Sequence, residues 1–348
     1  GILMSQITGW PLWLSVTTLM IIATSFTVAG GLAAVVATDS FQSVLMIIAS
    51  AILLIVALVK VSAIPNWTST VPSDFWQLFK PASDPDFPWY AIVLGYPVIA
   101  IWFWCTDQTI VQRALGARDL RHGQLGTQFA AYLKLFTPFL FYLPGILCFI
   151  LFPGLEDSNH AYLTMVANLM PIGLVGLVVA ILMAALVSTI DSALNSFSTV
   201  FTLDIYKSKF RPEATDKETK LVGRISTVLI AVIGIFIALA MDSVGRDLWN
   251  LIQGIIAFFA PPMAAVFLVG ILWKRATAKA AFVTLVLGSA VSLSIGACQF
   301  KEWPGPTFWP HYMLLSFFLF ASLVILMVVI SLLTKNSPEE EPLPSIIS

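Results

Sequence analysis

Long apolar segments are the feature that most limits how this chain can fold. Nine of them come close to or exceed the roughly 20 residues that a helix needs to cross the hydrocarbon core of a bilayer. Only 11% of the 348 residues are charged, whereas ordinary globular proteins carry about 25%. The sequence therefore predicts an all-α polytopic membrane protein. The predicted spans are residues 11–30, 40–62, 89–106, 127–152, 170–195, 222–241, 248–272, 279–299 and 311–334.

The basic residues between these spans are distributed unevenly. Of the 18 Lys and Arg residues, thirteen lie in alternate loops on one side, four lie on the other side, and Lys134 lies inside a span. Cytoplasmic loops of membrane proteins carry the excess of Lys and Arg. The side with thirteen is therefore predicted to be cytoplasmic, and the C-terminus lies on that side. Residues 336–348 are expected to form a cytoplasmic tail.

The opening residues GILMSQITGW contain no initiator Met, no basic segment and no cleavage site of a signal peptide. The predicted topology has an odd number of crossings with the first residues outside the cell. Both observations lead us to expect that a front portion of the protein precedes this chain.

Several function classes are disfavoured. A formal net charge of -1 leaves no basic surface to neutralise phosphates, which argues against a nucleic-acid partner. The three histidines, His122, His160 and His311, lie in loops or at span ends, and the chain has no HExxH or GxSxG motif. We therefore expect neither an enzyme nor an organic cofactor.

Ionisable residues inside spans are costly in lipid and are functional candidates by default. Asp39, Lys134 and Asp191 are the main candidates. Asp107 and Asp204 stand at span ends, where a carboxylate can cap a helix or meet headgroup water.

The fifth span has an oxygen-rich face. Ala185, Ser188, Thr189 and Ser192 follow one another at i, i+3, i+4 and i+7, so that one carbonyl and three hydroxyl groups share a helix face. Oxygen ligands of this kind suit a hard cation. The alternative is that these small residues let helices pack closely and that their hydroxyls bond back to their own backbone. Asp191 and Ser192 could form a second oxygen cluster with a carboxylate from another helix, for which Asp39 is the obvious candidate.

Several strings stand out along this chain, namely GGLAAVVATDSFQ, WFWCTDQTIVQRALGARD, AYLKL, STIDSALNSFSTVFTLDIY, LIQGIIAFFAPPMAAVFLVGILWKR and HYMLL with VVISLLTK. In this order they resemble strings of the sodium:solute symporter family, and within it the sodium/glucose cotransporters. The resemblance implies a LeuT-type inverted-repeat transporter, present here in part with about nine helices. Residues 1–335 would form its transmembrane transporter domain in the plasma membrane.

Family resemblance also implies ion sites. The main sodium site would take the carbonyl of Ala185 and the hydroxyls of Ser188 and Thr189. A second cation site, found in some members, would comprise Asp39, Ser188 and Ser192. Asp191 stands beside it where relatives more often have a small residue, and would either strengthen cation binding or admit proton coupling, because two close carboxylates do not easily ionise together.

The same resemblance assigns a substrate site. Lys134 and Gln253 would bond the hydroxyls of a sugar or polyol, Phe103 would stack on the sugar ring, and Trp104 and Asn250 would add contacts. An interfacial aromatic belt is the alternative for the aromatic pair. The resemblance thus implies sodium-coupled symport of a sugar or polyol, and the alternative is a symporter for another organic solute such as a carboxylate.

Overall fold

A computed structural model of the chain describes residues 1–155, 157–242, 248–305 and 307–334, and gives the backbone alone at 31–34, 241–242 and 248–251. Apart from one isolated β-bridge between Lys80 and Pro88, the described residues form helices, turns and loops. They fall into two compact units. The first consists of Gly1–Trp76 with Gln112–Gly245, and the second of Gln77–Val111 with Arg246–Ser348.

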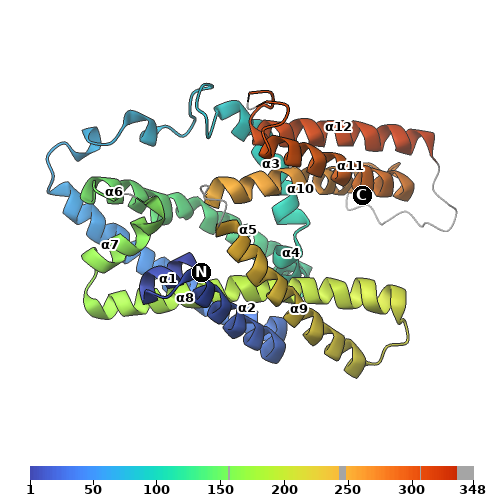
Figure 1. The fold of residues 1–348 in the computed structure, drawn as a ribbon, viewed down its shortest axis with the longest axis horizontal. Helices are drawn as coiled ribbons and strands as arrows, with labels where there is room; N and C mark the ends of the chain where they lie inside the picture. The colour runs from blue at the N-terminus through green and yellow to red at the C-terminus, as the bar shows by residue number, and fades with distance from the viewer. Residues whose placement is uncertain (156, 243–247, 306, 335–348) are drawn as a thin grey trace. The chain divides into compact units, whose positions relative to one another are not determined.

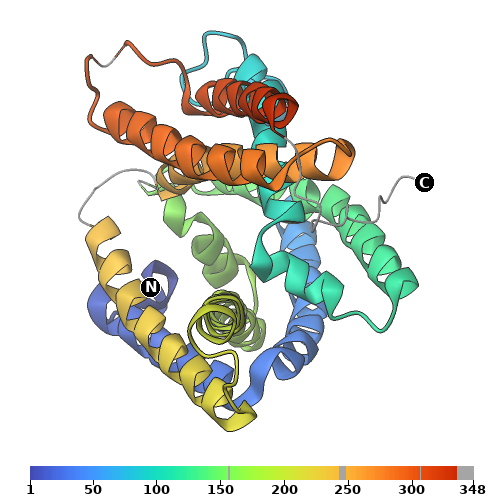
Figure 2. The same cartoon turned by 90° about the vertical axis from the view of Figure 1, so that its right-hand side faces the viewer.

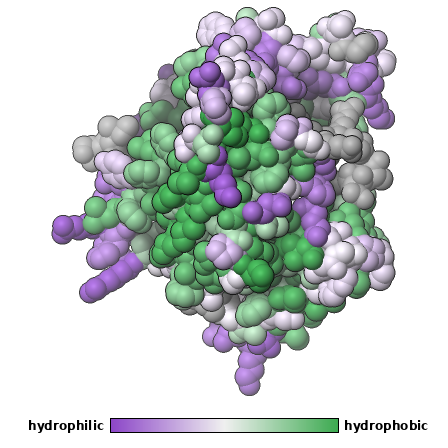
Figure 3. Space-filling model, turned by 90° about the vertical axis from the view of Figure 1, so that its left-hand side faces the viewer, coloured by the Kyte–Doolittle hydropathy of each residue, from purple (hydrophilic) through white to green (hydrophobic). Residues whose placement is uncertain are grey.

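The number of membrane crossings agrees with the sequence. Within the described residues, eight helices are long and apolar enough to span a bilayer, and a bent pair of helices brings the number to nine. Hydrophobic side chains cover much of the face shown in Figure 3, as expected where lipid replaces water as the solvent. The prediction of an all-α polytopic membrane protein is confirmed.

The first unit is built on α2, α8 and α9, which pack against one another (Figure 2). Small residues allow the close approach, since Ala23 of α2 and Ala231 of α9 are buried with Leu194 of α8. A larger cluster centred on Leu53 and Leu147 holds α6 and α7 to α2 and α8. The helices of this unit are α1 (Ile2–Thr8), α2 (Leu12–Ser62), α5 (Leu120–Thr137), α6 (Leu143–Leu151), α7 (Ala161–Leu169), α8 (Ile172–Thr199) and α9 (Asp216–Asp242).

Two predicted spans are longer than expected because helical backbone continues past the predicted ends. The π-helical stretch Pro138–Tyr142 joins α5 to α6. The apolar segment that corresponds to the predicted span 127–152 is Leu120–Leu151, which begins earlier because α5 begins at Leu120. A second π-helical stretch, Val200–Phe210, extends α8 beyond residue 195. Proline at positions 138 and 144 removes helical hydrogen bonds, which accounts for the irregular join between α5 and α6.

The first two predicted spans, residues 11–30 and 40–62, are joined by helical backbone. The backbone stays helical from Leu12 to Ser62, and Figure 2 shows α2 changing direction near its middle. This segment contains no proline, and its hydroxyls bond back to the helix, as Ser40 does to the carbonyl of Val36. Since nothing removes the helical hydrogen bonds, the chain turns between two crossings without leaving the helix.

The second unit is a bundle of α3, α10, α11 and α12, and Figure 1 shows the last three side by side. Its core contains Ile99 of α3 with Ala257 and Ala260 of α10, and a second cluster joins Phe258 to Leu315 and Leu319 of α12. The bounds are α3 (Trp89–Cys105), α10 (Leu248–Leu272), α11 (Ala278–Phe300) and α12 (Tyr312–Leu333).

The third predicted span, residues 89–106, ends in a bend. Helix α3 stops at Cys105, and α4 (Gln108–Leu115) follows at an angle of 48°. The carboxylate of Asp107 accepts hydrogen bonds from the backbone N–H of Thr109 at 2.9 Å and from its hydroxyl at 2.8 Å. Asp107 therefore caps the start of α4, which is the structural role expected for a carboxylate at a span end.

Gly95 is required where α3 crosses α12. A Cβ atom at this position would lie 2.0 Å from the carbonyl oxygen of Met313, and a backbone atom cannot move aside as a flexible side chain can. We expect Gly95→Ala to lower the free energy of unfolding by roughly 1–3 kcal/mol, as overpacking does in tight cores. Thermal unfolding of the detergent-solubilised protein would measure the loss.

Gly270→Ala is the matched control, because a Cβ atom on that glycine of α10 meets nothing within 4 Å. Alanine is the better helix former by about 1 kcal/mol, so this variant should unfold at the same temperature or slightly higher. An equal loss of thermal stability in both variants would show that Gly95 is not needed for the close crossing of α3 and α12.

Candidate functional site

Helix α8 carries the oxygen-rich face that the sequence predicted. It begins after Pro171, whose extended backbone starts the helix, and it remains α-helical through Ala185, Ser188, Thr189 and Ser192. The predicted spacing is therefore realised, and the four residues share one face of the helix.

The hydroxyls on this face bond to the turn before them. Thr189 donates its Oγ1 hydrogen to the carbonyl oxygen of Ala185 at 2.9 Å, and Ser192 donates to the carbonyl oxygen of Ser188 at 2.9 Å. A hydroxyl that donates its hydrogen keeps oxygen lone pairs free to accept. The two oxygens of Ala185 and Thr189 are thus adjacent and able to contact the same cation. Thr189 is exposed in this chain, whereas Ser188 is half-buried.

Asp39 of α2 lies at the same place on α8. Its Oδ1 accepts the hydroxyl hydrogen of Ser188, and its Oδ2 forms an ion pair at 2.8 Å with Nη2 of Arg113. Arg113 also donates to the hydroxyl oxygen of Ser192. Three residues predicted for a second cation site are therefore brought together, and the guanidinium of Arg113 lies among them.

Gln112 fixes α4, and with it Arg113, against α8. The Gln112 side chain is buried, its Oε1 accepts from Asn195 Nδ2 at 3.0 Å, and its Nε2 donates to the carbonyl of Ser192 at 3.5 Å. Two consecutive residues of α4 thus contact one turn of α8. The position of the guanidinium is set by packing as well as by charge.

Asp191 points elsewhere. Its side chain is 5% exposed, and Oδ1 accepts a hydrogen bond from the hydroxyl of Thr27 of α2 at 3.0 Å. The Asp191 carboxylate interacts electrostatically with Asp39, but its hydrogen bond is to Thr27 and not to the hydroxyls of Ser188 or Ser192. Membership of Asp191 in the second cation site stays a prediction.

Sequence reasoning missed Arg113, Gln112 and Thr27. In the sequence, Arg113 is one of the thirteen basic residues that predict the cytoplasmic side. A signal was available, because an aspartate inside a span needs a partner, and Arg113 belongs to the cytoplasmic loop nearest in the predicted topology to Asp39. Thr27 and Gln112 gave no comparable signal, since uncharged polar residues are common in membrane helices.

The predicted substrate residues are divided between the two units. Lys134 lies in the first unit, exposed in the last turn of α5. In the second unit, Phe103 is half-buried and its ring meets that of Trp104 edge to face at 5.1 Å, while Trp104 is exposed. Gln253 of α10 is 7% exposed. The side chain of Asn250 lies outside the described residues. The substrate roles of these five residues stay predictions.

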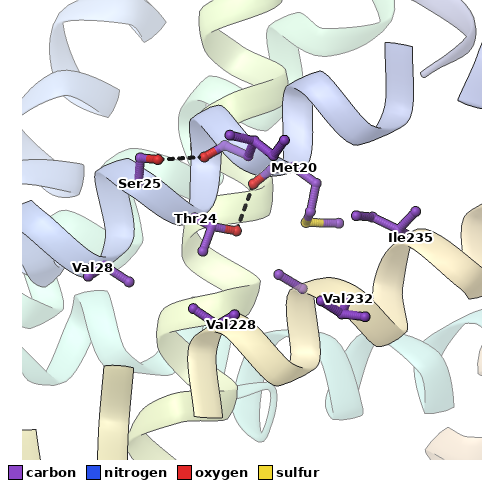
Figure 4. A pocket seen from close by; sticks show the side chains of 9 residues that line it. Met20, Thr24, Ser25, Val28, Val228, Val232 and Ile235 are labelled. Carbon is purple, nitrogen blue, oxygen red and sulfur yellow. Dashed lines mark hydrogen bonds between the residues drawn. The ribbon is translucent and has the colours of Figure 1, made fainter. Parts of the chain in front are cut away.

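A groove of about 320 Å³ between α2 and α9 is a separate feature (Figure 4). Its walls are mostly aliphatic, and its two hydroxyls bond within their own helix, Thr24 to the carbonyl of Met20 and Ser25 to that of Ile21. A polar solute or a cation would find few partners there. The groove is thus distinct in chemistry from the oxygen face of α8.

Comparison with known proteins assigns the family. The model of the sodium:solute symporter family matches residues 1–288, which is more than half of the chain. The chain belongs to the sodium:solute symporter family. The resemblance noted in the sequence is therefore confirmed, and the matched relatives are named as cotransporters and not as enzymes.

Three relatives illustrate the similarity. The chain is 36% identical to sodium/glucose cotransporter 4 of Homo sapiens, with 96% of this chain and 55% of the relative covered. It is 37% identical to a sodium/mannose cotransporter of Bos taurus, with 86% and 55% covered, and 36% identical to sodium/myo-inositol cotransporter 2 of Oryctolagus cuniculus, with 94% and 55% covered. The chain spans a little over half the length of these curated relatives.

A solved structure supports the fold. It is described as a substrate-bound outward-open state of a Na+-coupled sialic acid symporter, and it matches this chain with a TM-score of 0.78 over 98% of the chain and 70% of its own length. The two sequences are 20% identical. This similarity confirms the LeuT-type fold expected from the sequence.

Proposed function

We propose that this chain forms part of a sodium-coupled symporter that carries a sugar or polyol across the plasma membrane by alternating access, with its C-terminus in the cytoplasm. Na+ is the coupling ion. Family membership supports the coupling, since the family is named for sodium and a solute. The named substrates of the relatives, glucose, mannose and myo-inositol, support the solute class.

The single observation that carries the proposal is the oxygen face of α8. The carbonyl of Ala185 and the hydroxyl oxygen of Thr189 are 2.9 Å apart, and Ser188 stands beside them with its hydrogen directed to Asp39. Because Asp39 takes the hydrogen, the oxygen lone pairs of Ser188 are free to contact a cation. Three neutral oxygens in this arrangement suit Na+, which binds oxygen in preference to sulfur or nitrogen.

Gln253 is the stronger of the two proposed sugar contacts. Its amide is buried on α10, one turn before Ala257 in the cluster that packs α10 on α3, and α3 also carries Phe103. An amide both donates and accepts hydrogen bonds, which matches a neutral ligand with many hydroxyl groups. Lys134 is exposed in this chain, and its ammonium would add donors only.

Uptake into proteoliposomes containing the full-length protein tests the proposal. We expect an inward Na+ gradient to drive accumulation of at least one labelled hexose or inositol, and K+ in place of Na+ to abolish it. Labelled monocarboxylates and amino acids, offered at the same concentration, should not accumulate. Sodium-driven uptake of a carboxylate alone would assign the chain to the alternative solute class, and uptake independent of Na+ would contradict the proposal.

A further inference from the structure

A positive charge already occupies the place predicted for a second cation. Asp39, Ser188 and Ser192 were expected to surround an ion, and the guanidinium of Arg113 contacts two of them. It pairs with Oδ2 of Asp39 at 2.8 Å and donates to the hydroxyl oxygen of Ser192. Ser188 completes the group by donating to the other carboxylate oxygen of Asp39.

The guanidinium supplies a positive charge to Asp39 without an added ion. The two side chains pair at 2.8 Å, and their exposed fractions are 20% for Asp39 and 33% for Arg113. A Na+ ion entering beside the guanidinium would meet a like charge at short range. A Na+ ion bound to Asp39 would therefore need the position that the guanidinium holds.

Helix α4 holds the Arg113 guanidinium close to Asp39. Gln112, the residue before Arg113, is buried and bonded to Asn195 and to the carbonyl of Ser192. The guanidinium is thus carried by a turn of helix that is held against α8 beside Asp39. Because it is tethered to the protein, it loses less translational and rotational freedom at Asp39 than a dissolved ion does.

We propose that Arg113 is a tethered competitor of Na+ at Asp39, so that a second Na+ binds there only when the guanidinium leaves. Arg113 then controls how many coupling ions the protein holds. This inference rests on the proposed function for its consequence in transport, but the competition itself concerns Na+ and three side chains of the first unit.

Equilibrium binding of radiolabelled Na+ to the purified full-length protein tests the competition. Replacing Arg113 by Gln should tighten Na+ binding at Asp39 by roughly tenfold, the factor that corresponds to loss of one charge-assisted hydrogen bond. The increase should vanish in the double variant Arg113→Gln with Asp39→Asn. Arg118→Gln, which removes the same charge from an exposed position of the following loop, is the matched control and should bind Na+ as the unaltered protein does.

A second variant keeps the test valid if Arg113→Gln does not fold. Arg113→Lys retains the charge but not the planar fork that lets one group reach both Asp39 and Ser192. Its Na+ binding should be tighter than that of the unaltered protein and weaker than that of Arg113→Gln. Unchanged or weaker Na+ binding in both variants would overturn the proposal, as would an increase that survives Asp39→Asn.

Sodium-dependent uptake measured on the same preparations separates this proposal from the proposed function. Normal uptake by the unaltered protein, together with unchanged Na+ binding in Arg113→Gln, would overturn the competition and leave the symport intact. The opposite result is also informative. If no preparation shows sodium-dependent uptake but Arg113→Gln binds Na+ more tightly and this increase depends on Asp39, the competition is supported and the proposed function is contradicted.

Discussion

Replacing Ser188 and Thr189 together by Ala is expected to raise the Na+ concentration for half-maximal uptake by about one hundredfold, with little change in the rate at saturating Na+. The reason is that each substitution removes one oxygen from the face shared with the carbonyl of Ala185. A hydrogen bond or ligand contact to a charged group is worth roughly 1.5–3 kcal/mol, and every 1.4 kcal/mol is about tenfold in affinity. Uptake measured over a range of Na+ concentrations in proteoliposomes checks the shift.

Thr199→Ala is the matched control, because it removes a hydroxyl from the last residue of α8, ten residues beyond Thr189. Its Na+ dependence should equal that of the unaltered protein. Thr189→Ala alone should give about half of the shift on a logarithmic scale, and it leaves the bond between Ser188 and Asp39 in place. An unaltered Na+ dependence in the double variant would remove the ion site from α8.

Gln253→Leu is expected to weaken substrate binding by about tenfold while leaving Na+ affinity nearly unchanged. Leucine preserves most of the volume of this buried side chain and removes its amide. Net hydrogen bonds are worth roughly 0.5–1.5 kcal/mol each, and an amide can make two of them to neighbouring hydroxyls. Equilibrium binding of the labelled sugar at one saturating Na+ concentration is the measurement, because coupling between the two ligands cannot then disguise a loss of substrate contacts.

The control for this substitution is Gln77→Leu, which makes the same change at an exposed position of the same unit. Its substrate affinity should be normal. A normal affinity in Gln253→Leu as well would show that the Gln253 amide serves the packing of α10 and does not contact substrate.

The sequence predicted the fold well where lipid is the only solvent. Residues 248–272 were predicted as one span, and α10 runs from Leu248 to Leu272. The prediction succeeds because an apolar segment in a bilayer must satisfy its backbone hydrogen bonds internally, and a helix does so. The sequence predicts two separate spans at residues 11–30 and 40–62, and the structure joins them in the single helix α2. Polarity alone does not end a helix, since the backbone hydrogen bonds of residues 30–40 are satisfied within α2.

The oxygen face was predictable because it lies on one helix. Its spacing is a property of the α-helix and needs no knowledge of tertiary structure. The partners of Asp39 and Asp191 were not predictable in the same way, since Arg113 and Thr27 are far from them along the chain. Contacts of this kind depend on how helices pack. A single sequence shows that a polar residue inside a span needs a partner, but it does not show which residue that partner is.

Coupled flux of Na+ and sugar is the most direct test of sodium symport by this protein. Vesicles containing the full-length protein are given an inward gradient of the transported sugar and equal Na+ on both sides, and entry of radiolabelled Na+ is followed. We predict that the sugar gradient drives Na+ inward, and that, at the Na+ concentration that half-saturates the unaltered protein, this Na+ entry is largely lost in the variant with Ser188 and Thr189 replaced by Ala. Sugar that enters down its own gradient without moving Na+ would contradict the account.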